Sequence, residues 1–281
     1  MSAVVPRTVL LFLLAAVLLY VAFAGFLFVL QPRLVYFPTV PGRELTATPA
    51  DIGLAYDEVR FTAEDGVELH GWYVPGPRPD ASVVIFCHGN AGNISHRLEW
   101  LSMLHGTGLG ALLFDYRGYG QSTGSPDEPG TYRDARAAWD YLVGERGIEP
   151  GRIVIFGESL GGAIAAHLAS EVAPRALITI AAFSSVPDLA ADLYWFLPVR
   201  LLARFDYATA RFVGAVDAPV LLIHSRDDEI VPFSHAETLF ARAKEPKQLL
   251  EIRGDHNSGF IVSARQVEAG IRAFLERHPP R

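Results

Sequence analysis

A serine between glycines is the first residue of this chain whose type and setting could do chemistry. Ser159 lies in Gly157-Glu158-Ser159-Leu160-Gly161 and directly follows the apolar run Ile153–Phe156. The run predicts a buried strand and the residues from Gly161 onward predict a helix, so Ser159 would occupy a tight strand-to-helix turn. Small neighbours let the two elements approach, and the turn would raise the hydroxyl above the sheet edge. A nucleophilic serine needs this setting, although an ordinary connection with a capping serine has the same local pattern.

A nucleophilic serine also needs a general base, and His256 is the best placed histidine. In open α/β sheets the functional residues follow the carboxyl ends of the strands. His256 lies in the loop Arg253–Gly259, directly after the predicted strand Gln248–Ile252. Of the nine histidines, it alone follows both the serine and a plausible acid at a strand end. His256 is therefore predicted to take the serine proton as a base and to return it as an acid.

The orienting acid is expected in the loop after another predicted strand, Val220–His224. Asp227, Asp228 and Glu229 are consecutive in that loop. One inward-facing carboxylate would orient the histidine and stabilise the imidazolium that forms when the serine loses its proton. Either aspartate could do this, and three adjacent acids are equally typical of a solvated turn.

Two backbone N–H groups are candidates for stabilising a developing oxyanion. Leu160 would open the helix after Ser159, where N–H groups lack partners within the helix. Asn90 lies in the loop His88–Gly92, whose glycines let the backbone approach a substrate closely. His88 itself could act as a base, but its position ahead of the loop favours a structural role in which it holds the loop by hydrogen bonds.

Strands and helices alternate along most of the chain. Strands are predicted at Tyr56–Phe61, Val67–Val74, Ser82–Cys87, Gly110–Phe114, Ile153–Phe156, Ala176–Ala181, Val220–His224 and Gln248–Ile252. Helices are predicted at Asn93–His105, Thr131–Leu142, Leu160–Ala173, Ser234–Ala243 and Phe260–Glu276. The first two strands form a predicted hairpin. The alternation predicts an α/β fold over residues 51–281, with a mostly parallel sheet and helices on both faces.

The N-terminus differs from the rest because no charged residue occurs between Thr8 and Leu30. As a helix at about 1.5 Å per residue, this run could cross a hydrocarbon core of roughly 30 Å, so residues 1–33 are predicted to be a membrane anchor. A cleaved signal peptide is the alternative, with Ala22-Phe23-Ala24 as its cleavage site, but the apolar run continues beyond it. Flanking charges nearly balance, and signal-anchor logic places the main domain outside the cytoplasm. The proline-rich residues 34–50 are predicted to be a stiff connector.

Composition limits the classes of function. The net formal charge is −7 and no run of basic residues occurs, so nucleic-acid binding is not expected. Cys87 is the single cysteine, which excludes an intrachain disulfide and a cysteine-based zinc cluster. The histidine spacing suggests no metal site, and no cofactor is expected.

Six motifs occur in order along the chain. They are Val59-x-Phe61 with Asp65-Gly66 and Gly71-Trp72; His88-Gly89-Asn90-Ala91-Gly92; Asp115-Tyr116-Arg117-Gly118-Tyr119-Gly120-x-Ser122-x-Gly124; Gly157-Glu158-Ser159-Leu160-Gly161-Gly162; Asp228-Glu229-Ile230-Val231-Pro232; and Gly254-x-His256-Asn257. With these motifs, residues 51–281 resemble the α/β-hydrolase family, whose triad also runs serine, acid, histidine. Within it the chain resembles the membrane-anchored, small-capped serine hydrolases that include animal and fungal abhydrolase-domain proteins.

The resemblance also bears on individual residues. It implies that Asp228 is the triad acid, with Asp227 as its rival, because the family's acid directly precedes such a run ending in Val-Pro. It implies a structural role for the Asp115–Gly124 loop, tied by the charges of Asp115 and Arg117. Asp255 departs from the family, which more often has a small residue there, and its carboxylate could favour a protonated imidazole on His256 or compete for the ring N–H.

A small helical cap over the serine is expected at residues 184–216. Tyr194, Trp195 and Phe196 would line an apolar acyl pocket with Leu160 at its floor. An amphipathic helix packed on the domain would show the same pattern.

Together these patterns predict a serine hydrolase that cleaves an acyl ester or thioester through an acyl-enzyme. Ser159, His256 and Asp228 would form the triad, and Asn90 and Leu160 the oxyanion site. The anchor and the aromatic cap favour a lipid-like or acylated small-molecule substrate near the bilayer. A peptidase or amidase of the same fold, and a membrane-tethered binding protein without catalysis, are the alternatives.

Overall fold

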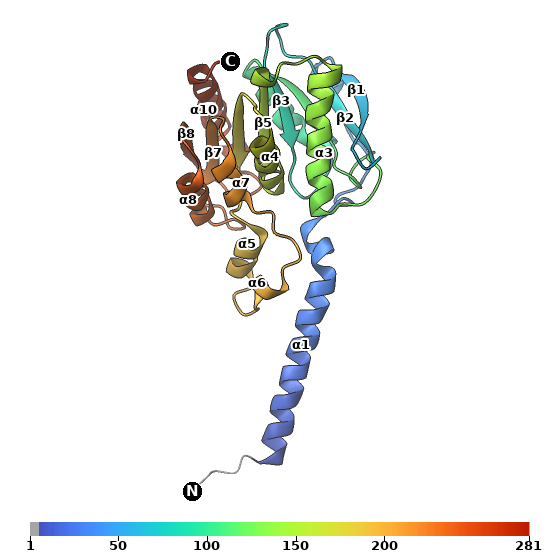
Figure 1. The fold of residues 1–281 in the computed structure, drawn as a ribbon, viewed down its shortest axis with the longest axis vertical. Coiled ribbons are helices and arrows are strands. Elements are labelled where there is room, and N and C mark those ends of the chain that lie inside the picture. Colours follow the sequence, from blue (N-terminus) through green and yellow to red (C-terminus); the bar gives the residue numbers. More distant parts are fainter. Residues whose placement is uncertain (1–5, 281) are drawn as a thin grey trace.

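The continuous apolar runs of the sequence form the centre of one eight-stranded sheet, in the order β1-β2-β4-β3-β5-β6-β7-β8. The computed structural model describes residues 6–280 (Figure 1). The strands are β1 Asp57–Thr62, β2 Glu68–Val74, β3 Val83–Cys87, β4 Gly110–Phe114, β5 Ile153–Glu158, β6 Ala176–Ile180, β7 Val220–Ser225 and β8 Lys247–Ile252. Every residue of β3, β4 and β6 is buried, as expected for strands covered on both faces.

The antiparallel pairs involve the first two strands, β1 and β2, which lie at one edge of the sheet. β1 and β2 form the predicted hairpin with Val59 opposite Gly71, and β2 runs antiparallel to β4. The other five neighbouring pairs are parallel. The carboxyl ends of these parallel strands therefore share one edge, where the loops after β3, β5, β7 and β8 can meet. The predicted mostly parallel α/β sheet is confirmed.

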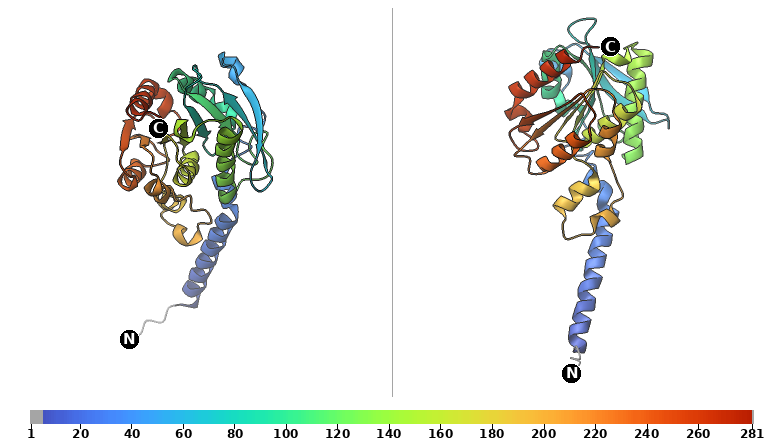
Figure 2. Two further views of the ribbon diagram at one scale, coloured as in Figure 1. Left: turned by 45° about the horizontal axis from the view of Figure 1, so that its top comes forward. Right: turned by 60° about the vertical axis from the view of Figure 1, so that its left-hand side comes forward.

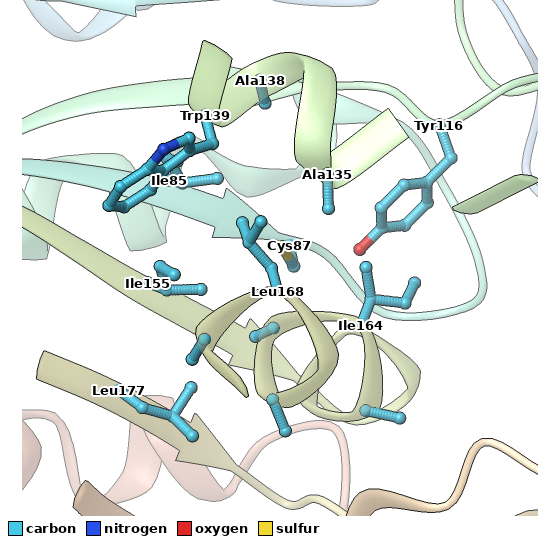
Figure 3. Close-up of a cluster of buried hydrophobic side chains, with 14 of the residues drawn as sticks. Ile85, Cys87, Tyr116, Ala135, Ala138, Trp139, Ile155, Ile164, Leu168 and Leu177 are labelled. Carbon is cyan, nitrogen blue, oxygen red and sulfur yellow. The ribbon is translucent and has the colours of Figure 1, made fainter. Parts of the chain in front are cut away.

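Helices cover both faces of the sheet. They are α2 Leu98–Gly106, α3 Glu128–Asp140, α4 Leu160–Glu171, α7 Thr209–Ala215, α8 Phe233–Arg242 and α10 Ala264–Arg277. α3, α4, α7 and α8 share one core with Ile85 and Cys87 of β3. Figure 3 shows the part of this core between β3, α3 and α4. α2 and α10 share the second core with Val84 and Phe86, the alternate residues of the same strand. The period-two alternation of strand side chains thus divides the apolar residues between two layers.

Local capping moves the ends of some helices from their expected positions. The helix expected from Asn93 begins as the 3-10 turn η2 Ile94–Arg97, because the Asn93 side chain accepts the Ser95 N–H at 3.0 Å. α3 begins earlier than expected because Asp127 accepts the Gly130 N–H at 2.6 Å. The single closing helix expected from Phe260 is divided into α9 Gly259–Val262 and α10. The remaining short elements are η1 Pro49–Ile52, η3 Tyr141–Glu145 and η4 Pro150–Arg152.

The N-terminal apolar run forms one long helix, α1 Arg7–Val35, that projects from the rest of the molecule (Figures 1 and 2). Within residues 6–280 it is the helix long and apolar enough to cross a membrane. Its 29 residues correspond to a length of about 44 Å. Ala24 is its buried residue. The helix continues through Pro32 and ends two positions beyond the expected anchor.

The segment after α1 is docked on the domain instead of bridging open space. The Phe37 N–H donates to the Asn90 carbonyl at 2.9 Å, and the Gly92 N–H donates to the Val40 carbonyl at 2.7 Å. Arg43 donates to the Gly120 carbonyl at 3.1 Å. These bonds hold the connector against the loops that follow β3 and β4, so the base of α1 has a defined position.

The segment predicted as a cap divides into two parts. α5 Val186–Leu193 and α6 Val199–Leu202 project from the domain beside α1 (Figure 2). α7 instead contributes Val213 to the core that it shares with α4. The expectation of a cap over all of 184–216 is therefore too broad, because α7 belongs to the helical layer of the domain. We call residues 186–203 the cap.

Candidate active site

Ser159 occupies the tight turn between β5 and α4. Its backbone has φ 51° and ψ −116°, in a region that residues with a side chain rarely adopt. A Cβ at Gly161 would overlap the carbonyl of Cys87, and one at Gly157 would overlap the carbonyl of Gly161. Both glycines are therefore needed for β5, α4 and the β3 loop to come together. The predicted strand–serine–helix turn is present, with backbone strain at the serine itself.

His256 connects Ser159 to Asp228 through two hydrogen bonds. The Ser159 Oγ and His256 Nε2 are 3.1 Å apart, and the His256 Nδ1 and Asp228 Oδ2 are 2.8 Å apart. With the ring proton on Nδ1 facing the carboxylate, Nε2 is free to accept the serine proton. The His256 side chain is 10% exposed and that of Asp228 is fully buried. The structure thus brings together three side chains from the loops after β5, β7 and β8.

The Asp228 carboxylate is held in its ionised form. Its second oxygen, Oδ1, accepts the N–H groups of Ile230 at 3.0 Å and Val231 at 2.7 Å. Burial alone would raise the pKa of Asp228, but the hydrogen bond from His256 and the bonds from the backbone outweigh burial and lower the pKa below its usual value. A buried carboxylate with these donors can stabilise an imidazolium without taking up its proton.

The other acids around His256 have separate partners. Asp227 pairs with Arg253 at 2.8 Å and accepts the Gly254 N–H at 3.3 Å. Glu229 accepts the backbone N–H of His256 at 3.0 Å. Asp255 accepts the N–H groups of Asn257 and Ser258 at 3.0 and 2.7 Å, so it caps its own turn. Of the two possible effects of Asp255, competition for the ring N–H does not occur, because His256 Nδ1 bonds to Asp228 and the Asp255 carboxylate bonds to its own turn.

The two predicted oxyanion residues border the same cavity as the serine. Asn90 and Leu160 both line it beside Ser159 and His256. Leu160 is the first residue of α4, so its N–H has no partner within the helix. The carbonyl of Asn90 accepts from Tyr119 at 2.8 Å as well as from the connector, which fixes the backbone at this position.

His88 is buried behind this loop. Its Nδ1 donates to the Gly89 carbonyl at 2.7 Å, and burial lowers the pKa of its imidazole to about 3. Its Nε2 faces the buried carboxyl of Asp115 at 3.6 Å. Asp115 accepts the Ile94 N–H at 3.0 Å, and burial raises the pKa of Asp115 to about 7. These contacts match the predicted structural role of His88.

Arg117 serves as a tie within the Asp115–Gly124 loop. It bonds to Asp134 and Asp65, each at 2.8 Å. Ser122 Oγ donates to the Asp115 carbonyl at 2.6 Å. The Arg117 charge is therefore paired inside the domain, whereas Asp115 holds the loop through its backbone carbonyl and its buried carboxyl bonds to Ile94. Neither residue lines the cavity.

The cavity beside Ser159 has a volume of about 350 Å³ and is lined by both polar and apolar residues. The domain contributes Gly89, Asn90, Arg97, Glu158, His256 and Asn257. Arg97 and Glu158 are paired there at 3.0 Å. The cap contributes the apolar residues Leu189, Leu193, Leu197 and Leu202, and α1 contributes Leu27, Phe28, Leu34 and Val35. An amphipathic molecule would match this combination.

The aromatic triplet of the cap is only partly in the cavity. Tyr194 lines it, whereas Trp195 and Phe196 do not and are 82% and 49% exposed. The expectation that Trp195 and Phe196 line the pocket is wrong. α5 ends at Leu193, and Tyr194 leaves the helical conformation, so the next two side chains turn away from the face that covers the cavity. Aliphatic residues form most of the cap's contribution instead.

A second serine–histidine–aspartate set lies at the base of the cap. Ser184 Oγ is 2.8 Å from His235 Nδ1, and His235 Nε2 is 3.1 Å from Asp192. The Ser184 backbone N–H also donates to Nδ1, at 3.0 Å, and Ser184 is buried. None of the three residues lines the cavity beside Ser159. The set fastens α5 to α8 and has no access to a substrate there.

The fold and the site have the features of an α/β-hydrolase: a mostly parallel sheet, a serine turn after β5, and an acid and a histidine in the loops after β7 and β8. The chain belongs to that family. Residues 82–218 match the family described as the alpha/beta hydrolase fold. The chain is 40% identical over 247 residues to the uncharacterized protein Rv2307c of Mycobacterium tuberculosis, with 87% of each chain covered. It is 35% identical over 242 residues to the alpha/beta hydrolase domain-containing protein WAV2 of Arabidopsis thaliana, with 79% of each covered.

A solved structure has the same fold. The chain is similar to the esterase Pf2001 of Pyrococcus furiosus, with a TM-score of 0.72 and 23% identity, over 87% of this chain and 99% of that one. At this identity the likeness extends to the fold. These comparisons and the cavity place the protein among the hydrolases of the family.

Proposed function

We propose that the protein is a serine hydrolase that cleaves an acyl ester or thioester on a lipid-like or acylated substrate near a membrane. The observation that carries the proposal is the chain of hydrogen bonds from Ser159 through His256 to Asp228. Nucleophile, base and orienting acid are within bonding distance, and the serine borders a cavity.

The proposed reaction begins with proton transfer from Ser159 Oγ to His256 Nε2 as Oγ bonds to the acyl carbon. The carbonyl oxygen becomes an oxyanion, for which the N–H groups of Asn90 and Leu160 are the proposed donors. Asp228 stabilises the imidazolium. Collapse breaks the bond to the leaving alcohol or thiol, which takes the proton from His256. Water then attacks the acyl-enzyme by the same sequence, with its proton passing through His256 to Ser159, and an acid is released.

The lining of the cavity supports this substrate class. The aliphatic side chains of the cap and α1 suit an acyl chain, because burying apolar surface away from water is favourable. Arg97, Glu158 and Asn257 suit a polar leaving group. The long apolar helix α1 supports a location at the bilayer, where such substrates reside.

Active-site labelling with a fluorophosphonate probe tests the proposal. The wild-type chain is expected to be labelled and Ser159→Ala to lose labelling. Ser184→Ala is the matched control, because Ser184 lies in the second serine–histidine–aspartate set and should leave labelling intact. Labelling that survives in Ser159→Ala would overturn the proposal. Acyl esters, thioesters and amides with matched acyl chains would then define the reaction, and preferred hydrolysis of the amides would favour a peptidase.

A further inference from the structure

α1 contributes a wall of the cavity in addition to being long enough for an anchor. Leu27, Phe28, Gln31, Leu34 and Val35 line the same cavity as Ser159. Their spacing of i, i+1, i+4, i+7 and i+8 is one face of a helix. A helix that served only as an anchor would not need one face in the wall of this cavity.

Hydrogen bonds connect α1 to the cap and to the residue that follows it, at two positions along the helix. Gln31 Nε2 donates to the Leu202 carbonyl at 2.7 Å, and Gln31 Oε1 accepts the Arg204 N–H at 2.8 Å. Nearer the N-terminus, the Tyr20 hydroxyl donates to the Phe196 carbonyl at 3.1 Å. The cap therefore follows α1 over about 16 Å of its length.

These contacts set the depth of the cap in a bilayer. If Arg7 stays outside the hydrocarbon, a core of roughly 30 Å ends near residue 27, because about 20 helical residues cross it. Phe196 contacts the helix at Tyr20 and so lies about 10 Å inside that boundary. Leu27 and Phe28, at the cavity wall, lie at the boundary itself.

The outer surface of the cap suits this depth. Trp195 and Leu201 are 82% and 86% exposed, and Leu193, Tyr194 and Phe196 are also exposed. α1, to which the cap is bonded at Tyr20, also exposes large apolar side chains along its length. Large apolar side chains of this kind stabilise a protein element in the interfacial layer of a membrane, whereas they are unfavourable in water.

We propose that the cap is embedded in the leaflet next to the catalytic domain and that acyl chains enter the site directly from that leaflet, along the cavity-facing side of α1. This rests on the proposed serine hydrolase function and adds the source of the substrate. The acyl chain slides along Leu27 and Phe28, beneath the cap, until its carbonyl reaches Ser159, while the polar leaving group stays beside Arg97.

Depth-dependent quenching of tryptophan fluorescence tests the insertion without any activity. The full chain in vesicles of phosphatidylcholine with brominated acyl chains is compared with unbrominated vesicles. Trp72, Trp100 and Trp139 are buried in the domain, so the quenching is expected to come from Trp195 and to be lost in Trp195→Phe. Equal quenching of the wild type and Trp195→Phe would overturn the proposal.

The entry path is tested with two substrates. Phe28→Ala is expected to lower the ratio of the rate for a long-chain ester carried in the vesicles to the rate for a short water-soluble ester by about tenfold, because only the long acyl chain loses an apolar contact. Leu19→Ala is the matched control on the same helix, since Leu19 is 72% exposed and does not line the cavity.

The outcomes separate the two proposals. Fluorophosphonate labelling in detergent first shows that each variant keeps its site. If Phe28→Ala slows both esters equally, or neither, while labelling depends on Ser159, the entry path is wrong and the serine hydrolase stands. If labelling does not depend on Ser159, the proposed function itself fails.

Discussion

Neighbouring aspartates in one loop have separate partners, and this difference can be measured. Asp228 bonds to the imidazole of His256, whereas Asp227 bonds to Arg253. Asp228→Asn is expected to lower kcat for a short-chain ester by about 10⁴-fold, because the histidine loses the partner that fixes its tautomer. Asp227→Asn should change kcat by no more than about twofold, since an exposed ion pair contributes little. The reverse ranking in steady-state kinetics would show that Asp227 is the acid.

A pH-dependent contribution to stability is expected from the buried carboxyl of Asp115, behind the loop His88–Gly92. The pKa of Asp115 is raised to about 7 in the folded chain from an ordinary 3.8. The folded state therefore binds more protons than the unfolded state between those values, so this residue's contribution to stability falls as the pH rises through that range. Asp115→Asn cannot titrate and should flatten the dependence, at about 1.4 kcal/mol per pKa unit.

Thermal unfolding in detergent across this pH range checks the Asp115 prediction. The wild type should lose stability with rising pH more steeply than Asp115→Asn. Parallel profiles for the two proteins would show that folding does not raise the pKa of Asp115.

Residue types and their order along the chain predict which residues form the site, but they do not predict the direction of every side chain. Ser159, Asp228 and His256 could be proposed because each follows a strand whose end lies at the same sheet edge. The directions of the Asp255 and Trp195 side chains do not follow from the sequence. Asp255 caps its own turn, and Trp195 lies just beyond the end of α5. Turn caps and helix ends depend on backbone angles at a few residues, which hydrophobic periodicity does not encode.

The turn that carries Ser159 requires glycine on its helical side. A Cβ at Gly161 would overlap the carbonyl of Cys87 on β3. Gly161→Ala is expected to lower the free energy of unfolding by about 1–3 kcal/mol and to reduce labelling, because α4 or the β3 loop must shift. Gly144→Ala is the matched control, since a Cβ there meets nothing within 4 Å. Thermal unfolding and labelling of the two variants check this; equal behaviour would show that the turn tolerates a Cβ.

Among the elements, the buried strands are the easiest to predict from the sequence. The contacts of α1 with the cap are the hardest to predict. β3, β4 and β6 follow from continuous apolar runs, and the hairpin from alternation beside a turn. Nothing in the apolar run Thr8–Leu30 distinguishes a face that meets protein from one that meets lipid, because both are apolar. Gln31, which directly follows that run, is a polar residue whose bonds to Leu202 in the cap and to Arg204 just after it mark the face that meets protein.

For the whole molecule, the contacts of α1 bear on whether its N-terminal part is removed. Cleavage after Ala24 would leave Leu27–Val35 in the cavity wall but remove Tyr20, which bonds to the cap. We therefore expect the protein to retain α1 in the membrane fraction. Intact-mass measurement of the purified protein checks this; a mass beginning at Gly25 would identify a cleaved signal peptide.

The docked connector also affects how the rate of the proposed reaction would depend on substrate concentration. Because residues 37–43 are bonded to the domain, the proposed anchor would hold Ser159 at one height and orientation over the bilayer. Its substrate would then be counted per area of membrane and not per volume of solution. Rates should follow the mole fraction of substrate among the lipids and stay constant when vesicles are diluted in buffer, so that the protein works as a catalyst in two dimensions.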